Sequence, residues 1–579
     1  MTDATVEGGL DEPTELEPDP GSLALAAPED TGGRAEWEAA AAAVLRKARR
    51  LSEDDADSLV WEKLTRTTLD GVGITPLGTP GLLGELSTAG RPTRTTDWDI
   101  RPHLSVTDAK SAHEEAITDL ENGATSLWLR VAPDTDLVTL LQGVFLDLAP
   151  VVLDCPDDAV ATARAFLEYA EDTDLHPATN LGIDAAEVSA GSLNGAEAAE
   201  LAARAGVLGF VVDATVVHDQ GASDGQELAY AMQVGAAYLR ALTAAGLDVD
   251  AAAALVEFRF AATDEQFPTI AKLRAARRLW ARVLELSGGS VTGMRQHVVT
   301  SRPMMSSYDP WVNMLRTTVA AFAAGVGGAD SVTVLPFDSP LGRPDALGRR
   351  VARNTSSLLI SESHLAKVAD PAGGSYAVEK LTDDLAVAAW DLFGRLDEGE
   401  DLAPLIEATV AVRDQQVATR KRPLTGLTEF PNLGETLPVR EPDPLAPHVR
   451  AYGADFEALR DSPAAAHVFL ATLGTVAAHT ARATFAANLL AAGGVAVDVA
   501  GPTQSAEDLL AAYAGQNVVC LAGSDGAYEG WGQEAAAALR EAGAEWVVIA
   551  GKPTDYTDDS CAMGVDALDF LTRTREKLA

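Results

Sequence analysis

The sequence predicts an α/β protein in which a (β/α)8 barrel precedes a smaller doubly wound domain of flavodoxin-like layout. Two observations support this fold class. Short runs rich in β-branched and aromatic residues alternate with helix-length segments between residues 125 and 371, which is the rhythm of a parallel barrel. A second, shorter series of the same kind follows a proline-rich stretch near the C-terminus and predicts the doubly wound domain.

The N-terminal segment, residues 1–34, is acidic and rich in glycine and proline. Such a composition buries too little apolar surface to offset the entropy of ordering. We therefore expect a disordered tail, or one that orders by wrapping a partner. Residues 35–52 (AEWEAAAAAVLRKARRLS) combine strong helix formers and predict a helix. The barrel, with this N-terminal extension and its trailing helices, is expected to span residues 35–430.

Seven runs have the composition of barrel strands, and an eighth is less regular. The seven are residues 125–131, 149–154, 178–184, 207–214, 254–260, 295–301 and 331–336. The eighth candidate is LAKVADP, residues 365–371. Helix-length segments such as PTIAKLRAARRLWARVLELS separate the runs, as a barrel of alternating strands and helices requires.

Residues 431–462 carry many prolines and little periodicity, and we interpret them as an interdomain linker. The last domain is then expected at residues 463–579. Four short apolar runs in it are typical of buried parallel strands: HVFLATLG, VAVDVAG, NVVCLAG and EWVVIAGK. The helix TARATFAANLLAAGG ends in glycine, a common helix stop.

Composition excludes several classes of protein. The formal net charge is −42, which argues against a nucleic-acid partner and against an anionic membrane surface. No apolar run reaches the roughly 18–20 residues that span a bilayer, and no basic residue precedes Arg34, so we expect no signal peptide. Cys155, Cys520 and Cys561 are too widely spaced to predict a metal site or a disulfide framework. We expect a cytoplasmic protein.

Several long stretches resemble the methylmalonyl-CoA mutase family. They include DPWVNMLRTT, ESHLAKVADPAGGSYAVEKLTDDLAVAAW and LTGLTEFPNL. The similarity covers most of residues 35–435 and extends weakly into the C-terminal domain. The order of barrel, linker and flavodoxin-like domain is also that of the cobalamin-dependent acyl-CoA mutases. The resemblance implies an isomerase that interconverts (R)-methylmalonyl-CoA and succinyl-CoA, with adenosylcobalamin supplying the radical chemistry.

The positions that hold cobalamin in this family are altered. The family uses an Asp-x-His-x-x-Gly motif with a lysine just upstream; the histidine binds cobalt and the aspartate orients it. The corresponding stretch here is LATLGTVAAHTARA. Matching its turn at Gly474 places Val476 at the Asp position and Ala478 at the His position. Ala481 then stands at the Gly position and Thr472 at the Lys position.

Valine and alanine offer cobalt no lone pair, so the comparison with the family implies that this chain binds neither cofactor nor metal. His479 is one residue from the ligand position. A shift of one residue would let it serve as ligand, yet no aspartate would orient it. We favour a surface histidine near a helix start.

The barrel positions that bind substrate in the family are altered too. The family's Tyr-x-x-Arg-Pro-Trp-Thr-Ile-Arg element reads TRTTDWDIR, with Thr93 at the Tyr position. The element that carries the catalytic histidine reads TVVHDQGA, which puts Val216 at the His position and His218 at the Gln position. In RQHVVTS, Val299 replaces a family glutamine. The family segment bearing a carboxylate-binding arginine has no counterpart between residues 182 and 206.

Other polar residues have plainer interpretations. Arg295 and His297 match the family, and we expect them to satisfy each other or the barrel interior. Asp154, Asp213 and Asp338 follow predicted strands, where we expect solvated or helix-capping carboxylates. The GVGG run at residues 325–328 is expected to end a helix rather than cradle phosphate.

These losses favour a non-catalytic small subunit that pairs with a homologous catalytic large subunit as a heterodimer and stabilises it. Adenosylcobalamin would then be held by the partner. Two alternatives stay open. One is a divergent, self-sufficient acyl-CoA mutase with a repurposed His479 or His218; the other is a non-enzymatic CoA-binding or chaperone protein.

Overall fold

The computed structural model describes residues 32–84, 86, 94–183, 194–290 and 293–579. They form two compact units. The smaller unit contains residues 32–66 and 73–77, and the larger unit contains the other described residues. The proposed tail, residues 1–34, lies almost wholly outside the described part of the chain.

The smaller unit is built around two helices, α1 (Arg34–Lys47) and α2 (Val60–Leu64). The unit also contains Arg66, the first residue of the short strand β1 (Arg66–Thr67), and the strand β2 (Gly73–Ile74). Trp37 of α1 and Trp61 of α2 pack with ring centroids 4.6 Å apart. The buried residues beside them are Ala42, Leu45, Leu51 and Val60. The unit therefore has a small apolar core of its own.

A parallel sheet of nine short strands forms the centre of the larger unit, in the order β3-β11-β10-β9-β8-β7-β6-β5-β4. The strands are β3 (Asp99–Ile100), β4 (His103–Ser105), β5 (Leu127–Arg130), β6 (Val151–Asp154), β7 (Asn180–Ile183), β8 (Leu208–Asp213), β9 (Val256–Ala262), β10 (Arg295–Thr300) and β11 (Ser331–Thr333). All seven predicted runs between residues 125 and 336 are confirmed as strands.

The sheet closes into a barrel because its two edge strands are consecutive pieces of one segment. β3 pairs with β11, and β4 pairs with β5. Pro102, which has no N–H to give a ladder, lies between the two pieces. The Arg101 amide donates to Val332 O at 3.1 Å, and the Trp128 amide donates to Pro102 O at 3.0 Å. Residues 99–105 therefore act as one strand of a (β/α)8 barrel.

The expected eighth strand at residues 365–371 is wrong. Residues Leu365–Lys367 form a 3₁₀ turn, η5. His364 before it and Asp370 after it have φ of 52° and 48°, and such left-handed residues interrupt an extended chain. The barrel strand that completes the set is instead the polar segment at residues 99–105.

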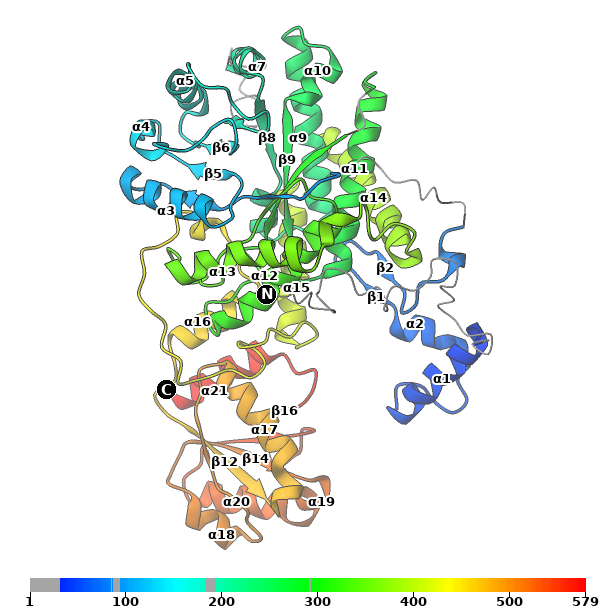
Figure 1. The fold of residues 1–579 in the computed structure, drawn as a ribbon. Coiled ribbons are helices and arrows are strands. Elements are labelled where there is room, and N and C mark those ends of the chain that lie inside the picture. The colour runs from blue at the N-terminus through cyan, green and yellow to red at the C-terminus, as the bar shows by residue number, and fades with distance from the viewer. Residues whose placement is uncertain (1–31, 85, 87–93, 184–193, 291–292) are drawn as a thin grey trace, which may run out of the picture. The chain divides into compact units, whose positions relative to one another are not determined.

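Helices lie outside the barrel strands (Figure 1). They are α3 (Ala109–Glu121), α4 (Leu137–Leu140), α5 (Ala159–Tyr169), α7 (Asn194–Ala205), α8 (Thr215–Asp219), α9 (Asp224–Ala244), α10 (Val249–Ala254), α11 (Gln266–Leu286), α12 (Pro310–Val326), α13 (Ala346–Ser357), α14 (Tyr376–Asp397) and α15 (Ala403–Ala418). As expected, the GVGG run ends a helix: α12 stops at Val326, and Gly328 has φ +87°.

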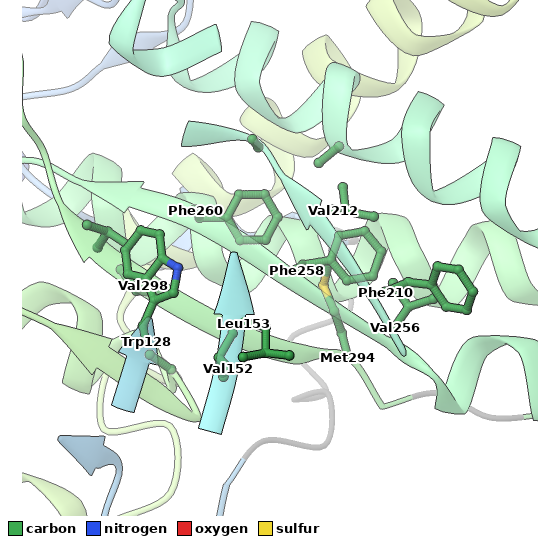
Figure 2. Packing of buried hydrophobic residues seen from close by; sticks show 14 of the residues in the cluster. Trp128, Val152, Leu153, Phe210, Val212, Val256, Phe258, Phe260, Met294 and Val298 are labelled. Carbon is green, nitrogen blue, oxygen red and sulfur yellow. The ribbon is translucent and has the colours of Figure 1, made fainter. Parts of the chain in front are cut away.

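Large apolar side chains fill the layer between strands and helices. Figure 2 shows Phe210 and Val212 of β8 near Phe258 and Phe260 of β9. Phe258 meets Trp280 of α11 with ring centroids 4.7 Å apart, and Phe210 meets Tyr238 of α9 at 5.7 Å. Burying each such aromatic stabilises the fold by about 1.5–3 kcal/mol. The outward side chains of the strands thus form the main core.

The C-terminal part has a five-stranded parallel sheet in the order β13-β12-β14-β15-β16. This is the 2-1-3-4-5 order of flavodoxin-like proteins. The strands are β12 (Val468–Leu473), β13 (Val497–Val499), β14 (Val518–Gly523), β15 (Trp546–Ala550) and β16 (Asp559–Cys561). The helices are α17 (Val476–Ala492), α18 (Ala506–Ala512), α19 (Asp525–Ala527), α20 (Gln533–Glu541) and α21 (Ala567–Leu578). The four predicted strands are confirmed, and β16 was not foreseen.

Residues 431–462, interpreted as a linker, include one regular helix, α16 (Ala454–Asp461). Phe456 of this helix is buried in a cluster with Tyr308 and with Val468 of β12. The exact domain boundaries stay a prediction. Among the residues that the structure describes, no helix has the length and apolarity to cross a membrane.

Gly182 in β7 provides a test of the barrel. Its φ is +74°, and a Cβ there would lie 1.9 Å from Leu153 O of the neighbouring strand. Gly182→Ala should destabilise the protein by about 3 kcal/mol or more, because both backbone strain and overlap arise. Gly246→Ala is the matched control: its φ is +103° with nothing within 4 Å, so it should cost only about 1 kcal/mol. Urea unfolding measures both, and equal losses would contradict the packing argument.

Candidate functional site

The barrel interior begins, at the amino ends of the strands, with a buried ion network. Arg101 donates to Glu257 at 3.0 Å, to Asp99 at 3.1 Å and to Ser126 at 3.1 Å. Arg295 donates to the other oxygen of Glu257, also at 3.1 Å. Because a lone buried charge is strongly unfavourable, each of these groups depends on the others.

His297 occupies the middle of the interior and is neutral. Burial, and then the charges of Arg101 and Arg259, hold the pKa of His297 well below its usual value. Arg259 Nε donates to His297 Nδ1 at 3.1 Å, and His297 Nε2 lies 2.7 Å from Thr333 Oγ1. Thr333 Oγ1 in turn donates to Arg101 O at 2.6 Å. Arg295 and His297 thus satisfy the barrel interior rather than each other.

Ion pairs join neighbouring elements at the carboxyl ends of the strands, where barrel enzymes place their active sites. Arg130 of β5 donates to Asp154 of β6 at 2.9 Å. Arg259 of β9 donates to Asp213 of β8 at 2.6 Å and lies 4.0 Å over the ring of Trp128. These pairs border a cavity of about 310 Å³.

A third pair, between Arg302 and Asp219 at 3.0 Å, borders the same cavity. Asp154 and Asp213 are therefore ion-paired rather than simply solvated. Asp338, also expected to be solvated or capping, is buried and paired with Arg440. The expectation is corrected in part: each carboxylate pairs with an arginine, while Asp213 also accepts from the amide of Thr215, the first residue of α8, at 2.9 Å.

Two of the three sequence-predicted barrel positions lie in the described part of the chain. Val216, in α8, is half exposed and lines the cavity. Val299, on β10, is buried. Thr93 lies outside the described residues. Val216 and Val299 contribute no polar atom to the barrel mouth.

His218 belongs to a separate buried network. Its Nε2 lies 2.7 Å from Ser301 Oγ, and its Nδ1 lies 3.4 Å from Glu227 Oε2. A serine, histidine and carboxylate in this order can activate a nucleophile when the hydroxyl meets substrate. Here Ser301 is 1% and His218 is 3% exposed, so the hydroxyl is closed to substrate. Lys272 completes the network by donating to Glu227 at 2.6 Å.

The same network continues to Asp224 and Asp70. Lys272 pairs with Asp224 at 2.8 Å. Asp70 accepts hydrogen bonds from the Ser223 hydroxyl and, at 3.1 Å, from the Gly225 amide. Burial, followed by the nearby charge of Asp224, raises the pKa of Asp70 to about 6. This carboxyl is therefore held closer to its neutral form than an ordinary aspartate.

The C-terminal positions compared with the cobalamin motif gather where β12 passes into α17. Val476, the first residue of α17, is 58% exposed, and Ala481 is exposed as well. Ala478 lies against the turn at Gly474. Thr472 is buried and donates to Gly501 O. The structure thus brings all four positions together around one strand end.

His479 is not the surface residue that we expected. It lies in the first turn of α17 but is only 7% exposed. Its Nδ1 has no hydrogen-bond partner among the described residues. The expectation failed because helix position alone does not say which face of α17 packs inward. A buried imidazole of this kind is not presented to a ligand.

The crevice at the topological switch point, between β12 and β14, is bridged by side chains. Arg482 of α17 donates to Gly523 O at 2.7 Å and pairs with Asp525 beyond β14. Tyr528, at the neighbouring strand pair, accepts from the Gly523 amide at 3.0 Å and donates to Ala550 O at 2.8 Å, so it links the ends of β14 and β15. Ligands of doubly wound sheets usually bind at the switch point, and here Arg482 joins α17 to the end of β14 across it.

A protein-family model described as methylmalonyl-CoA mutase matches residues 208–498. The methylmalonyl-CoA mutase small subunit of Streptomyces virginiae is 44% identical over 97% of this chain and 99% of its own. The chain belongs to the methylmalonyl-CoA mutase family. The small subunit from Propionibacterium freudenreichii subsp. shermanii is 34% identical over 96% of this chain and 97% of that protein. Methylmalonyl-CoA mutase of Escherichia coli is 33% identical over 37% of this chain and 31% of that protein.

The residues of this family member do not fit cobalamin. Val476, Ala478 and Ala481 carry no donor atom for cobalt or for orienting a ligand, and the hydroxyl of Thr472 is already bonded to Gly501 O. His479 is buried. A metal-binding histidine needs an exposed ring nitrogen and an oriented second nitrogen. The misfit with cobalamin therefore concerns the position of the cobalt-binding histidine and also the positions of the residues that would orient it.

Sequence reasoning missed the arginines of the barrel mouth and the Arg482 bridge. The signal for Arg259 was present: Glu257 and Arg259 alternate with Phe258 and Phe260 in the strand VEFRFAA. Alternation of polar and apolar residues in a barrel strand predicts a polar interior face. Arg302 and Arg482 lie in loop and helix positions without such a periodic signal.

Asp70 gives a pH-dependent prediction. A carboxyl whose pKa is raised on folding favours the folded state while protonated, and this contribution disappears as pH rises through the folded value. Because burial raises the pKa of Asp70 from 3.8 to about 6, the wild type should lose about 2 kcal/mol of stability relative to Asp70→Asn between pH about 4 and pH about 6. Thermal unfolding across this range measures the difference. Asp555→Asn, at an exposed site, is the control, and a constant gap between wild type and Asp70→Asn would refute the assignment.

Proposed function

We propose that this chain is the non-catalytic small subunit of adenosylcobalamin-dependent methylmalonyl-CoA mutase. It pairs with a homologous catalytic large subunit as a heterodimer in the cytoplasm and stabilises it. The large subunit holds adenosylcobalamin and interconverts (R)-methylmalonyl-CoA and succinyl-CoA. The observation that carries the proposal is the set of Val476, Ala478 and Ala481 around the end of β12, on a chain that aligns over nearly its full length with proteins named small subunit.

The barrel supports the same proposal independently. Ion pairs and a neutral histidine fill its interior, so a substrate entering along the axis would meet Arg259 stacked on Trp128. Buried charged groups with mutual partners resist displacement, because moving one leaves the other unpaired. The interior acts as a packed core. A subunit that lends structure to a partner needs such a core and no open channel.

The self-sufficient mutase is disfavoured by the state of its two candidate histidines. His218 is engaged with Ser301, and His479 is buried. Neither ring is open to a ligand, whereas general acid–base or metal chemistry requires contact with the reacting group. The chaperone or CoA-binding alternative differs from the proposal in its partner and in its ligand, so partner capture and calorimetry with CoA esters on the isolated chain decide between them.

The cofactor prediction concerns the full chain purified without a large subunit. Incubated with adenosylcobalamin or hydroxocobalamin and passed through gel filtration, it should carry no corrin absorbance, because the motif positions lack donor atoms. The matched control is the chain co-expressed with a catalytic large subunit, which should co-purify with it and carry cobalamin. Stoichiometric corrin on the chain alone, with a cobalt–imidazole signal in electron paramagnetic resonance, would contradict the proposal.

The His479 prediction separates the proposal from a divergent enzyme. In the co-expressed complex, His479→Ala should leave cobalamin content and turnover within about twofold of wild type, since no step relies on this imidazole. His467→Ala is the control, because His467 is half exposed and pairs with Asp498 at 2.9 Å. Loss of bound cobalamin in His479→Ala but not in His467→Ala would sink the assignment. Anaerobic activity assays and corrin absorbance provide the two readouts.

A further inference from the structure

The outer side of the barrel carries an apolar face that stays exposed in the described chain. It belongs to α12 and α13, which are in contact with each other. Trp311 and Leu315 are one helical turn apart on α12, and they are 56% and 70% exposed. Leu347 lies in the first turn of α13 and is exposed as well. Because residues four apart lie on the same side of a helix, Trp311 and Leu315 point outward together.

Contacts beneath this surface bring the starts of the two helices together. The ring of Trp311 stacks on Phe337 with centroids 5.0 Å apart. The next residue, Asp338, accepts a hydrogen bond of 3.1 Å from the amide of Asp345, which caps α13. Trp311 is therefore close to the first turn of α13, where Leu347 lies, and the exposed apolar side chains form one patch.

The same patch lacks the negative charge that the rest of the chain carries. The sequence has 86 aspartates and glutamates and a formal net charge of −42. Among the described barrel helices of at least ten residues, α12 and α13 are the two without a carboxylate. Asp345, directly before α13, is paired with Arg440 at 3.1 Å. Arg350 is exposed on α13 and has no ion-pair partner among the described residues.

These features are those of a protein–protein contact. Exposed apolar residues on a monomer are normally scattered, whereas a contiguous patch marks an interaction site. The centre of such a site is depleted of charged residues and enriched in tryptophan and arginine. The patch on α12 and α13 combines the missing carboxylates with Trp311 and an unpaired Arg350.

We propose that the α12–α13 face, made of Trp311, Leu315, Leu347 and Arg350, is the surface on which this chain binds the catalytic large subunit. The inference rests on the proposed function and names the surface that it uses. A second copy of this chain is a poor occupant, because it would add another net charge of −42. The family model spans residues 208–498 and so includes both helices. A homologous large subunit thus has its own counterpart of this helix pair, and two related barrels can meet through equivalent faces around an approximate two-fold axis.

The test uses the full chain co-expressed with an affinity-tagged catalytic large subunit, and gel filtration at decreasing concentration gives the dissociation constant of the complex. Leu315→Glu places an unpaired carboxylate in the buried contact and should weaken binding about thirtyfold or more. Leu315→Met keeps an apolar side chain of similar volume and should bind within about twofold of wild type. Arg350→Ala removes the free cation and should weaken binding about threefold to tenfold. Because Leu315 and Arg350 are exposed, thermal unfolding of the isolated chain should stay unchanged in all three variants.

Val387→Glu is the matched control, because Val387 is 55% exposed on α14, a barrel helix that already carries carboxylates. Its affinity for the large subunit should lie within about twofold of wild type. If Leu315→Glu binds as tightly as wild type, or Val387→Glu weakens binding equally, the surface is wrong and the proposed function stands. If the large subunit does not bind wild type, the proposed function fails and this surface fails with it. A homodimer of the isolated chain that Leu315→Glu dissociates would assign the face to a second copy and overturn the proposal.

Discussion

The shared carboxylate of Glu257, which receives hydrogen bonds from Arg101 and Arg295 deep inside the barrel, is the interaction on which much of the remaining structure depends. A closed parallel barrel must fill its own axis. This chain fills it with charges, and charges removed from water need partners at close range. Three sets of polar side chains follow one another along the barrel axis. The Glu257 network lies at the amino ends of the strands, the neutral His297 lies in the middle, and the arginine pairs lie at the carboxyl ends. Each set orients the next through Arg259 and Thr333.

Much of the fold could be predicted because the outward faces of the strands are apolar. Runs such as LWLR and VVLD carry the β-branched and aromatic residues that pack under helices. The first strand escaped prediction because its pieces, Asp99–Ile100 and His103–Ser105, are short, polar and separated by Pro102. The segment LAKVADP was misread since alternation alone cannot reveal the left-handed residues His364 and Asp370 around it.

The candidate site, like the fold, could be predicted from the sequence only in part. Positions that depend on residue type, such as Val476 and Ala478, could be judged from sequence, because an aliphatic side chain offers no lone pair in any fold. Positions that depend on partners could not. The burial of His479 and the bridge from Arg482 to Gly523 O arise from how α17 packs on the sheet.

Closure of the barrel by residues 99–105 has a consequence for biosynthesis. The Arg101 amide finds its acceptor, Val332 O, only after more than two hundred further residues have been made, so the nascent chain cannot seal its sheet while it is being translated. Until then the early strands present an unpaired edge, which is a template for unwanted association. Ring completion is a long-range event of high contact order, and such events are slow. The edge of the early strands stays unpaired until the last barrel strand, β11, pairs with the first, β3.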